Sequence, residues 1–219
     1  MPKIKISPSI LSANLNRLNE EIKEIEDYSD LLQVDAMDNI FVPNITPQAE
    51  LLKKFNTKVP LDIHLMVKEP TNWVERSVRA GADRIIGQIE MMENQVNFVR
   101  KVSEVGLSVG LAIDLGTPVS SLDPTILTNL DVVLVMAVSA GFGGQKFDAK
   151  ALDKVKQLDE IRVRDETPFT ICVDGGETED VIDETHFAGA DEVAIGRRIF
   201  KGSITQNIKK FQKAAYRVK

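Results

Sequence analysis

Eight short apolar segments, each followed by a longer helical or irregular stretch, restrict the fold of this 219-residue chain more than any other feature. These segments are rich in Val, Ile and Leu, and they comprise residues 3–10, 31–37, 61–67, 84–90, 108–113, 132–138, 169–174 and 192–196. Strict alternation of strands and helices predicts a parallel sheet with right-handed crossovers. Eight repeats are enough to close such a sheet, so we predict a (β/α)8 TIM barrel.

The segments between the strands show helical spacing of their apolar residues. In the first of them, Leu15, Leu18, Ile22 and Ile25 recur every three or four residues, which predicts one helical face. The predicted helices span residues 15–28, 47–55, 71–80, 95–105, 148–161, 178–188 and 204–214, and residues 118–130 are expected to hold only short helical pieces. Asn14, Thr46-Pro47 and Glu69-Pro70 are the expected helix starts.

An open, doubly wound sheet is the structural alternative. Such sheets usually carry fewer strands and a glycine-rich first turn, whereas residues 9–14 contain no glycine. Neither a linker nor a low-complexity tract interrupts the series. We therefore expect residues 1–219 to form a single barrel domain.

Composition and charge narrow the choice of partners. The formal net charge is −6 and there is no long run of Lys or Arg, which disfavours nucleic acid and anionic membranes. Cys172 stands alone, so no internal disulfide can form, and its apolar neighbours predict a buried structural thiol. The N-terminus has no signal-like apolar region, and no apolar run is long enough to span a bilayer. We expect a cytoplasmic protein whose partner is a small molecule.

Ionisable residues lie at the carboxyl ends of three predicted strands, where TIM barrels place their active sites. Asp35, His64 and Asp174 belong to the second, third and seventh strands. A lone buried histidine is usually a hydrogen-bonded core residue. Three potential ligands that converge on one barrel mouth instead favour a metal site. Asp38, Asp62 and Asp83 are equally well explained as turn or cap residues.

Glycines follow the sixth, seventh and eighth strands, in the loops that form the usual phosphate site of these barrels. They are Gly141, Gly143 and Gly144, then Gly175 and Gly176, then Gly196. Glycine allows backbone N–H groups to approach an anion closely, although tight turns also need glycine. Three such sites on consecutive strands predict a phosphorylated ligand.

Several blocks of sequence, in order, resemble the ribulose-phosphate 3-epimerase family almost from end to end. The matching blocks are ISPSILSA (residues 6–13), VDAMD (34–38), FVPN (41–44), DIHLMV (62–67), GFGGQ (141–145), VDGG (173–176) and AGAD (188–191). This resemblance implies an isomerase of carbohydrate metabolism that inverts carbon 3 of a ketose phosphate, with ribulose 5-phosphate and xylulose 5-phosphate as the first candidates.

The resemblance also implies roles for particular residues. Asp35 and Asp174 would exchange protons with the two faces of an enediolate, which a divalent metal would stabilise. The metal would be held by Asp35, His64, Asp174 and the residue at position 33, with zinc as the first choice and Mn or Mg as alternatives. The family implies a small phosphorylated sugar as partner, and a homo-oligomer. The residues expected to contact substrate are Ser9, Met37, His64, Gly141, Phe142, Gly143, Gly144, Gly175, Gly176, Gly196 and Arg197.

The chain departs from the family pattern inside the expected site. Gln33 and Gln88 stand where histidines are usual, Asn39 replaces a glycine, and Arg197 and Arg198 replace small residues. An amide oxygen is a weaker ligand for zinc than imidazole, so the metal site should be weakened. Two alternatives therefore stay open. One is an epimerase or isomerase of another sugar phosphate, in which the glutamines bind substrate hydroxyls. The other is a non-catalytic sugar-phosphate-binding protein.

Overall fold

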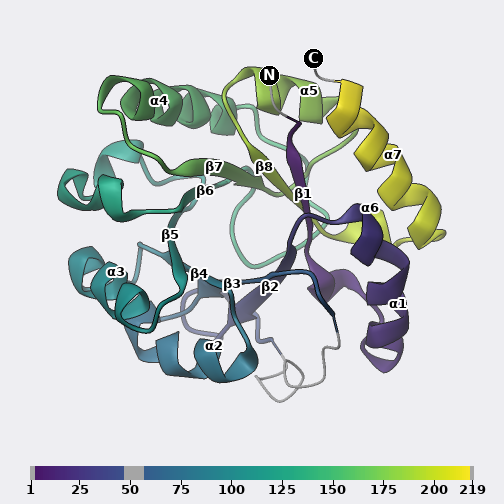
Figure 1. Ribbon diagram of the computed structural model, residues 1–219, viewed down its shortest axis with the longest axis horizontal. Helices are drawn as coiled ribbons and strands as arrows, with labels where there is room; N and C mark the ends of the chain where they lie inside the picture. The colour runs from purple at the N-terminus through teal and green to yellow at the C-terminus, as the bar shows by residue number, and fades with distance from the viewer. Residues whose placement is uncertain (1–2, 47–56, 218–219) are drawn as a thin grey trace.

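The protein folds around one eight-stranded parallel sheet, which helices surround (Figure 1). The computed structural model describes residues 3–46 and 57–217. Its strands are β1 (Lys5–Pro8), β2 (Leu32–Met37), β3 (Leu61–Met66), β4 (Arg84–Gln88), β5 (Ser108–Ile113), β6 (Val132–Met136), β7 (Thr170–Asp174) and β8 (Glu192–Ile195). They follow the order β1-β8-β7-β6-β5-β4-β3-β2. The predicted (β/α)8 TIM barrel is confirmed.

The barrel closes between β1 and β2, which stand at the two ends of that order. An isolated parallel bridge joins Ser9 to Gln33 just beyond β1. At the other end of the barrel, the backbone N–H groups of Asp30 and Leu31 donate to the carbonyl oxygen of Ile6. This seam therefore passes through Ser9 and Gln33, two residues of the predicted site.

The helices broadly follow the expected order. They are α1 (Leu18–Ile25), α2 (Val74–Ala80), α3 (Gln95–Glu104), α4 (Lys150–Arg164), α5 (Val181–Phe187), α6 (Arg197–Phe200) and α7 (Ile204–Arg217). The expected short helical pieces within residues 118–130 are two 3-10 turns, Val119–Ser121 and Pro124–Asn129. The helix predicted at residues 47–55 lies outside the described residues.

The continuous helix predicted over residues 15–28 was wrong. The chain forms a 3-10 turn at Leu15–Arg17, then α1, then a second 3-10 turn at Glu26–Tyr28. Asn14 caps the first turn by accepting a hydrogen bond from the N–H of Asn16. Arg17 leaves helical geometry at φ −124° and ψ 19°. Leu15 is 42% exposed, so its helical spacing did not reflect burial.

Two apolar clusters hold the barrel together. The larger lies between the sheet and the helices and includes Ile22, Ile85, Phe98 and Phe211. The smaller contains side chains of Ile86, Leu134 and Cys172, which point into the barrel. Cys172 is 1% exposed, as predicted for a structural thiol, and burial raises the pKa of its thiol well above the usual value.

A buried ion cluster lies near the amino ends of β3, β4 and β8. The Arg84 guanidinium donates hydrogen bonds to the carboxylates of Asp62 and Glu192. All three side chains are at most 8% exposed. The interpretation of Asp62 as a turn or cap residue was therefore wrong. It points into the barrel two residues before His64, because alternate side chains of a strand share a face.

Candidate active site

Two carboxylates face each other at the carboxyl ends of β2 and β7. Gln33, Asp35 and Met37 alternate along β2 and so share its inner face, while Asp174 is the last residue of β7. Asp35, His64 and Asp174 each offer a ligand atom, and these atoms lie within 4.8 Å of one another. The three potential ligands found in the sequence thus converge, with Asp35 and Asp174 largely buried.

The side-chain amide of Gln33 bridges the two carboxylates. Its Nε2 donates to Asp35 Oδ1 at 2.8 Å and to Asp174 Oδ2 at 2.6 Å. Its Oε1 is buried and has no hydrogen-bond partner among the described residues. The sequence predicts that Gln33 offers its amide oxygen to a metal, whereas its amide nitrogen faces the carboxylates here.

His64 lies behind these carboxylates on the neighbouring strand β3, where it is directly opposite Asp35. Its Nδ1 is 3.2 Å from Asp35 Oδ1 and 3.8 Å from Asp174 Oδ2. Its Nε2 is 2.9 Å from Gln88 Oε1. The imidazole is fully buried, so its neighbours fix the ring from both sides.

The environment moves the two carboxyl pKa values in opposite directions. Burial would raise the pKa of Asp35, but hydrogen bonds and charge from His64, with further bonds from Ser9 and Gln33, lower it overall. Burial and the nearby Asp35 charge raise the pKa of Asp174 to about 7. Burial would lower the pKa of His64, but Asp35 and Asp174 outweigh it and raise the value. The lowered pKa of Asp35 favours its ionised form, and the raised pKa of Asp174 favours a protonated form up to about neutral pH.

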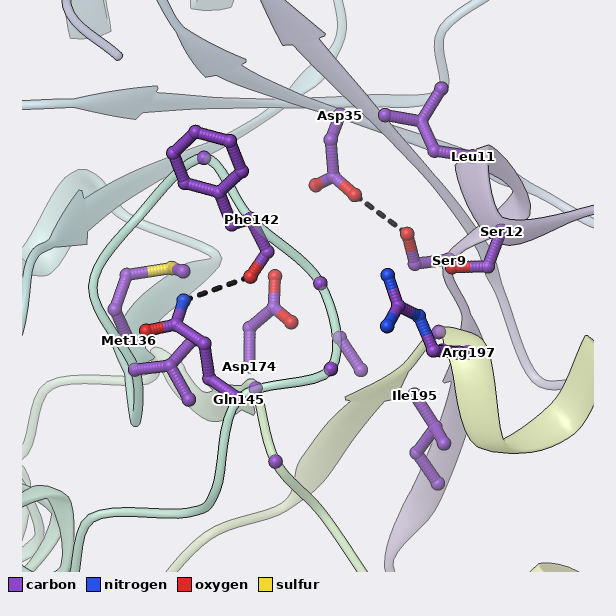
Figure 2. Close-up of a pocket in the computed structure, with 18 of the residues that line it drawn as sticks. Ser9, Leu11, Ser12, Asp35, Met136, Phe142, Gln145, Asp174, Ile195 and Arg197 are labelled. Carbon is purple, nitrogen blue, oxygen red and sulfur yellow. Dashed lines mark hydrogen bonds between the residues drawn. The ribbon is translucent and has the colours of Figure 1, made fainter. Parts of the chain in front are cut away.

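These carboxylates open into a cavity of about 640 Å³. Figure 2 shows Asp35 and Asp174 from opposite sides of this cavity, with Ser9 donating a 2.6 Å hydrogen bond to Asp35 Oδ2. The predicted substrate residues that line it are Ser9, Met37, Gly141, Phe142, Gly143, Gly144, Gly175, Gly176, Gly196 and Arg197. Gln33, His64 and Gln88 are not among the lining residues and are fully buried.

The glycine loops form the wall of the cavity on the β6, β7 and β8 side. Gly144 has a φ of +86°, and a β-carbon there would lie 2.5 Å from Nη1 of Arg197. The loop therefore needs glycine at this position. Figure 2 shows the Arg197 guanidinium turned into the cavity. Asn39, which replaces a family glycine, has a φ of +60°, consistent with its expected left-handed backbone.

Three further charged residues line this cavity, of which Arg198 was expected in the site and Lys201 and Glu177 were not. Arg198 and Lys201 belong to α6 and the residue after it, a short helix that the periodicity did not predict. The three-residue spacing of Arg198 and Lys201 places both side chains on one face of a helix, and this spacing is the sequence signal that could have placed Lys201 beside Arg198. Glu177 directly follows Gly175-Gly176 and is only 2% exposed. Burial raises its pKa to about 8.

Comparison with known proteins identifies the family of this chain. The sequence profile of the ribulose-phosphate 3 epimerase family matches residues 5–200. The chain belongs to this family. It is 37% identical to ribulose-phosphate 3-epimerase of Buchnera aphidicola subsp. Acyrthosiphon pisum, over 93% of the chain and 90% of that protein. It is also 37% identical to the Serratia marcescens enzyme, over 91% of the chain and 97% of that protein.

Membership of the ribulose-phosphate 3-epimerase family makes the protein an isomerase-class epimerase, as the resemblance implied. Among solved structures, phosphoribosyl anthranilate isomerase from Thermococcus kodakaraensis superposes with a TM-score of 0.63 at 16% identity, over 96% of this chain and 98% of that one. That likeness concerns the barrel alone. Within the described residues, no helix combines the length and the apolar character that crossing a membrane requires.

Proposed function

We propose that this epimerase interconverts ribulose 5-phosphate and xylulose 5-phosphate by moving a proton between Asp35, carbon 3 and Asp174. The observation that carries this proposal is the pair of converging carboxyls whose pKa values are shifted apart. A general base and a general acid must differ in protonation state at the working pH, and the opposite directions of the two pKa shifts support that division. The family and its relatives give the reaction class.

The proton transfer needs one group on each face of the sugar carbon. Carbon 3 lies next to the ketone, so removal of its proton by the Asp35 carboxylate leaves a planar enediolate. Protonation by Asp174 from the opposite face then inverts the centre. In the reverse reaction Asp174 takes the proton and Asp35 returns it. Ser9 and Gln33 donate to these carboxylates and hold them in place.

The residues around this pair also suit a divalent cation. Asp35, His64 and Asp174 supply three ligand atoms. The buried, unpartnered Oε1 of Gln33 is a fourth, since rotation of the amide by half a turn exchanges its oxygen and nitrogen. A bound cation would supply positive charge that stabilises the oxyanion of the enediolate. Two carboxylates, one imidazole and one amide suit zinc first, with Mn or Mg as the harder alternatives.

The other end of the cavity suits a phosphate group. The residues of the glycine loops line this cavity together with Arg197, Arg198 and Lys201. Glycine backbones and cationic side chains are the usual means of holding a phosphate dianion. We assign the sugar phosphate to this cavity, with its phosphate at the glycine loops and carbon 3 between the carboxylates.

The Gln33 bridge favours a second candidate. An amide that already spans both carboxylates offers a way to hold them together without a cation. An epimerase or isomerase of another sugar phosphate, with a weak or absent metal site, is consistent with this contact. In that case other ketose phosphates would be better substrates than ribulose 5-phosphate. A binder without catalysis is disfavoured, because Asp174 and His64 remain buried at a free-energy cost.

Conversion of ribulose 5-phosphate, followed by NMR, tests the proposal. We expect wild-type protein to produce xylulose 5-phosphate, and Asp35→Asn or Asp174→Asn to lower kcat by about 10²–10⁴-fold. Asp153→Asn, on the exposed side of α4, is the matched control and should retain activity. Wild-type activity in either site variant would refute the two-carboxylate mechanism. Preference for another ketose phosphate would support the second candidate.

A further inference from the structure

We propose that Gln88 is a positioning residue, which keeps a proton on Nε2 of His64 and so leaves Nδ1 as the atom that would bind a cation. This inference rests on the metal site of the proposed function. It concerns a residue that does not touch the substrate cavity, because Gln88 is fully buried and is not among the lining residues. The possibility that Gln88 binds a substrate hydroxyl is therefore disfavoured.

The hydrogen bond from His64 to Gln88 determines which ring nitrogen carries the proton. Gln88 Oε1 lies 2.9 Å from His64 Nε2, and a carbonyl oxygen can only accept a hydrogen bond. His64 Nε2 must therefore donate. Gln88 Nε2 is buried and has no partner among the described residues, so the contact of Oε1 with His64 Nε2 is the hydrogen bond that this amide makes there.

The opposite side of the ring faces the two carboxylates. Nδ1 lies 3.2 Å from Asp35 Oδ1 and 3.8 Å from Asp174 Oδ2. Nδ1 donates to the Asp35 carboxylate here. A cation held by the two carboxylates would displace that proton and take the Nδ1 lone pair, while Nε2 keeps its own proton. Partners that hold the far nitrogen of a ligand histidine in this way usually change metal affinity when they are removed. Gln88 occupies that place on β4, next to β3.

Only two histidines occur in the chain, so ¹⁵N-histidine NMR can resolve both rings. His186 is an internal reference, because its Nδ1 lies 3.0 Å from the carbonyl oxygen of Ala190 and must donate. We expect the zinc-loaded protein to carry the His64 proton on Nε2 and the His186 proton on Nδ1. A His64 proton on Nδ1 with zinc bound would overturn the inference.

Two variants at position 88 separate a positioning role from a purely structural one. Gln88→Met has similar volume but no acceptor, and we expect it to weaken zinc binding about 10–100-fold and to lose the Nε2–H signal. Gln88→Glu keeps an acceptor oxygen, so it should retain both the zinc affinity and the Nε2–H signal of His64. Zinc affinity is measured by competition with a chelator, and thermal melting confirms that each variant is folded.

The outcomes also distinguish this inference from the proposed function. A folded Gln88→Met variant with wild-type zinc affinity and an unchanged His64 signal would refute the role of Gln88. If the wild-type protein binds no zinc, the proposed role of Gln88 in preparing His64 for a cation is refuted as well. Failure to epimerise ribulose 5-phosphate, with the expected zinc and NMR results, would count against the substrate and leave the inference about Gln88 supported.

Discussion

Gln33 links the two carboxylates of the candidate site. Its amide bridges Asp35 and Asp174, at a position where the resemblance to the family implies a histidine. The bridge satisfies both carboxylates in a buried place, where an unpaired charge would be costly. It also explains how the two acids can stay close together.

Restoring that histidine should strengthen zinc binding. Imidazole nitrogen is a better zinc ligand than an amide oxygen, so we predict that Gln33→His lowers the Kd for zinc and makes activity less sensitive to chelators. Competition with a zinc chelator measures the change. Gln33→Leu, which can neither bridge nor ligate, is the matched control and should bind zinc no better than wild type. Equal affinity in wild type and Gln33→His would show that position 33 does not face the metal.

Glu177 should make the stability of the fold depend on pH. Burial raises its pKa to about 8 from a usual value near 4.5, and Thr185 supplies one hydrogen bond. Between these values the folded state holds a proton that the unfolded state has lost. The free energy of unfolding therefore falls as pH rises through this window, by about 1.4 kcal/mol per unit for this group, and then levels off above pH 8.

Glu177→Gln should remove this contribution, because an amide does not titrate. Urea unfolding at several pH values between 5 and 9 measures the slope for each protein. We predict that the variant gains stability over wild type as pH rises, with the gain complete near pH 8. The raised pKa of Asp174 adds a slope of the same sign to both proteins, so only their difference tests Glu177. A constant difference across the range would contradict the prediction.

At the scale of elements, the amino ends of three strands are joined by a buried charge cluster instead of apolar packing. Arg84 on β4 pairs with Asp62 on β3 and Glu192 on β8. Without the guanidinium, two carboxylates would be left buried side by side. We predict that Arg84→Met lowers the free energy of unfolding by about 3–5 kcal/mol.

Equilibrium unfolding in urea tests this prediction. Arg79→Met is the control, because Arg79 forms an exposed pair with Glu75 on α2 and such pairs contribute little. If Arg84→Met were as stable as Arg79→Met, the ion pairs of Arg84 would contribute nothing to the free energy of unfolding beyond the packing of the side chain. The acids would then have to be neutral in the folded protein.

The same elements show what the sequence could and could not predict. All eight strands were found, since buried parallel strands are continuous apolar runs, although most predicted strands ran one to four residues too long. The short helix α6 was missed because four residues give no periodicity. The break near Arg17 was missed because an apolar spacing does not reveal that Leu15 is exposed.

The sequence predicted which residues gather in the site, but not the contacts that their atoms make. Asp35, His64 and Asp174 could be placed together because strand ends meet at one mouth of a barrel. Which atom of Gln33 faces the carboxylates could not be predicted, because an amide offers a donor and an acceptor of nearly equal shape. Asp62 looked like a turn residue because its partners, Arg84 and Glu192, are distant in sequence.

At the scale of the whole molecule, barrel closure brings the groups of the proposed mechanism together. Ser9 and Gln33 meet across the seam between β1 and β2, and they bond to carboxylates on β2 and β7. Acid and base therefore come from strands that are far apart in the chain, which only the closed barrel brings to opposite sides of one cavity (Figure 2).

Hydrogen exchange at carbon 3 in heavy water tests this two-carboxylate arrangement most directly. At early times we predict that xylulose 5-phosphate formed from ribulose 5-phosphate carries solvent deuterium at carbon 3, while the remaining substrate stays unlabelled. Asp174→Asn should form product at least about 10²-fold more slowly but should still label one of the two epimers through Asp35. Product that retains the original proton would mean that a single group serves both faces, and would contradict the central claim.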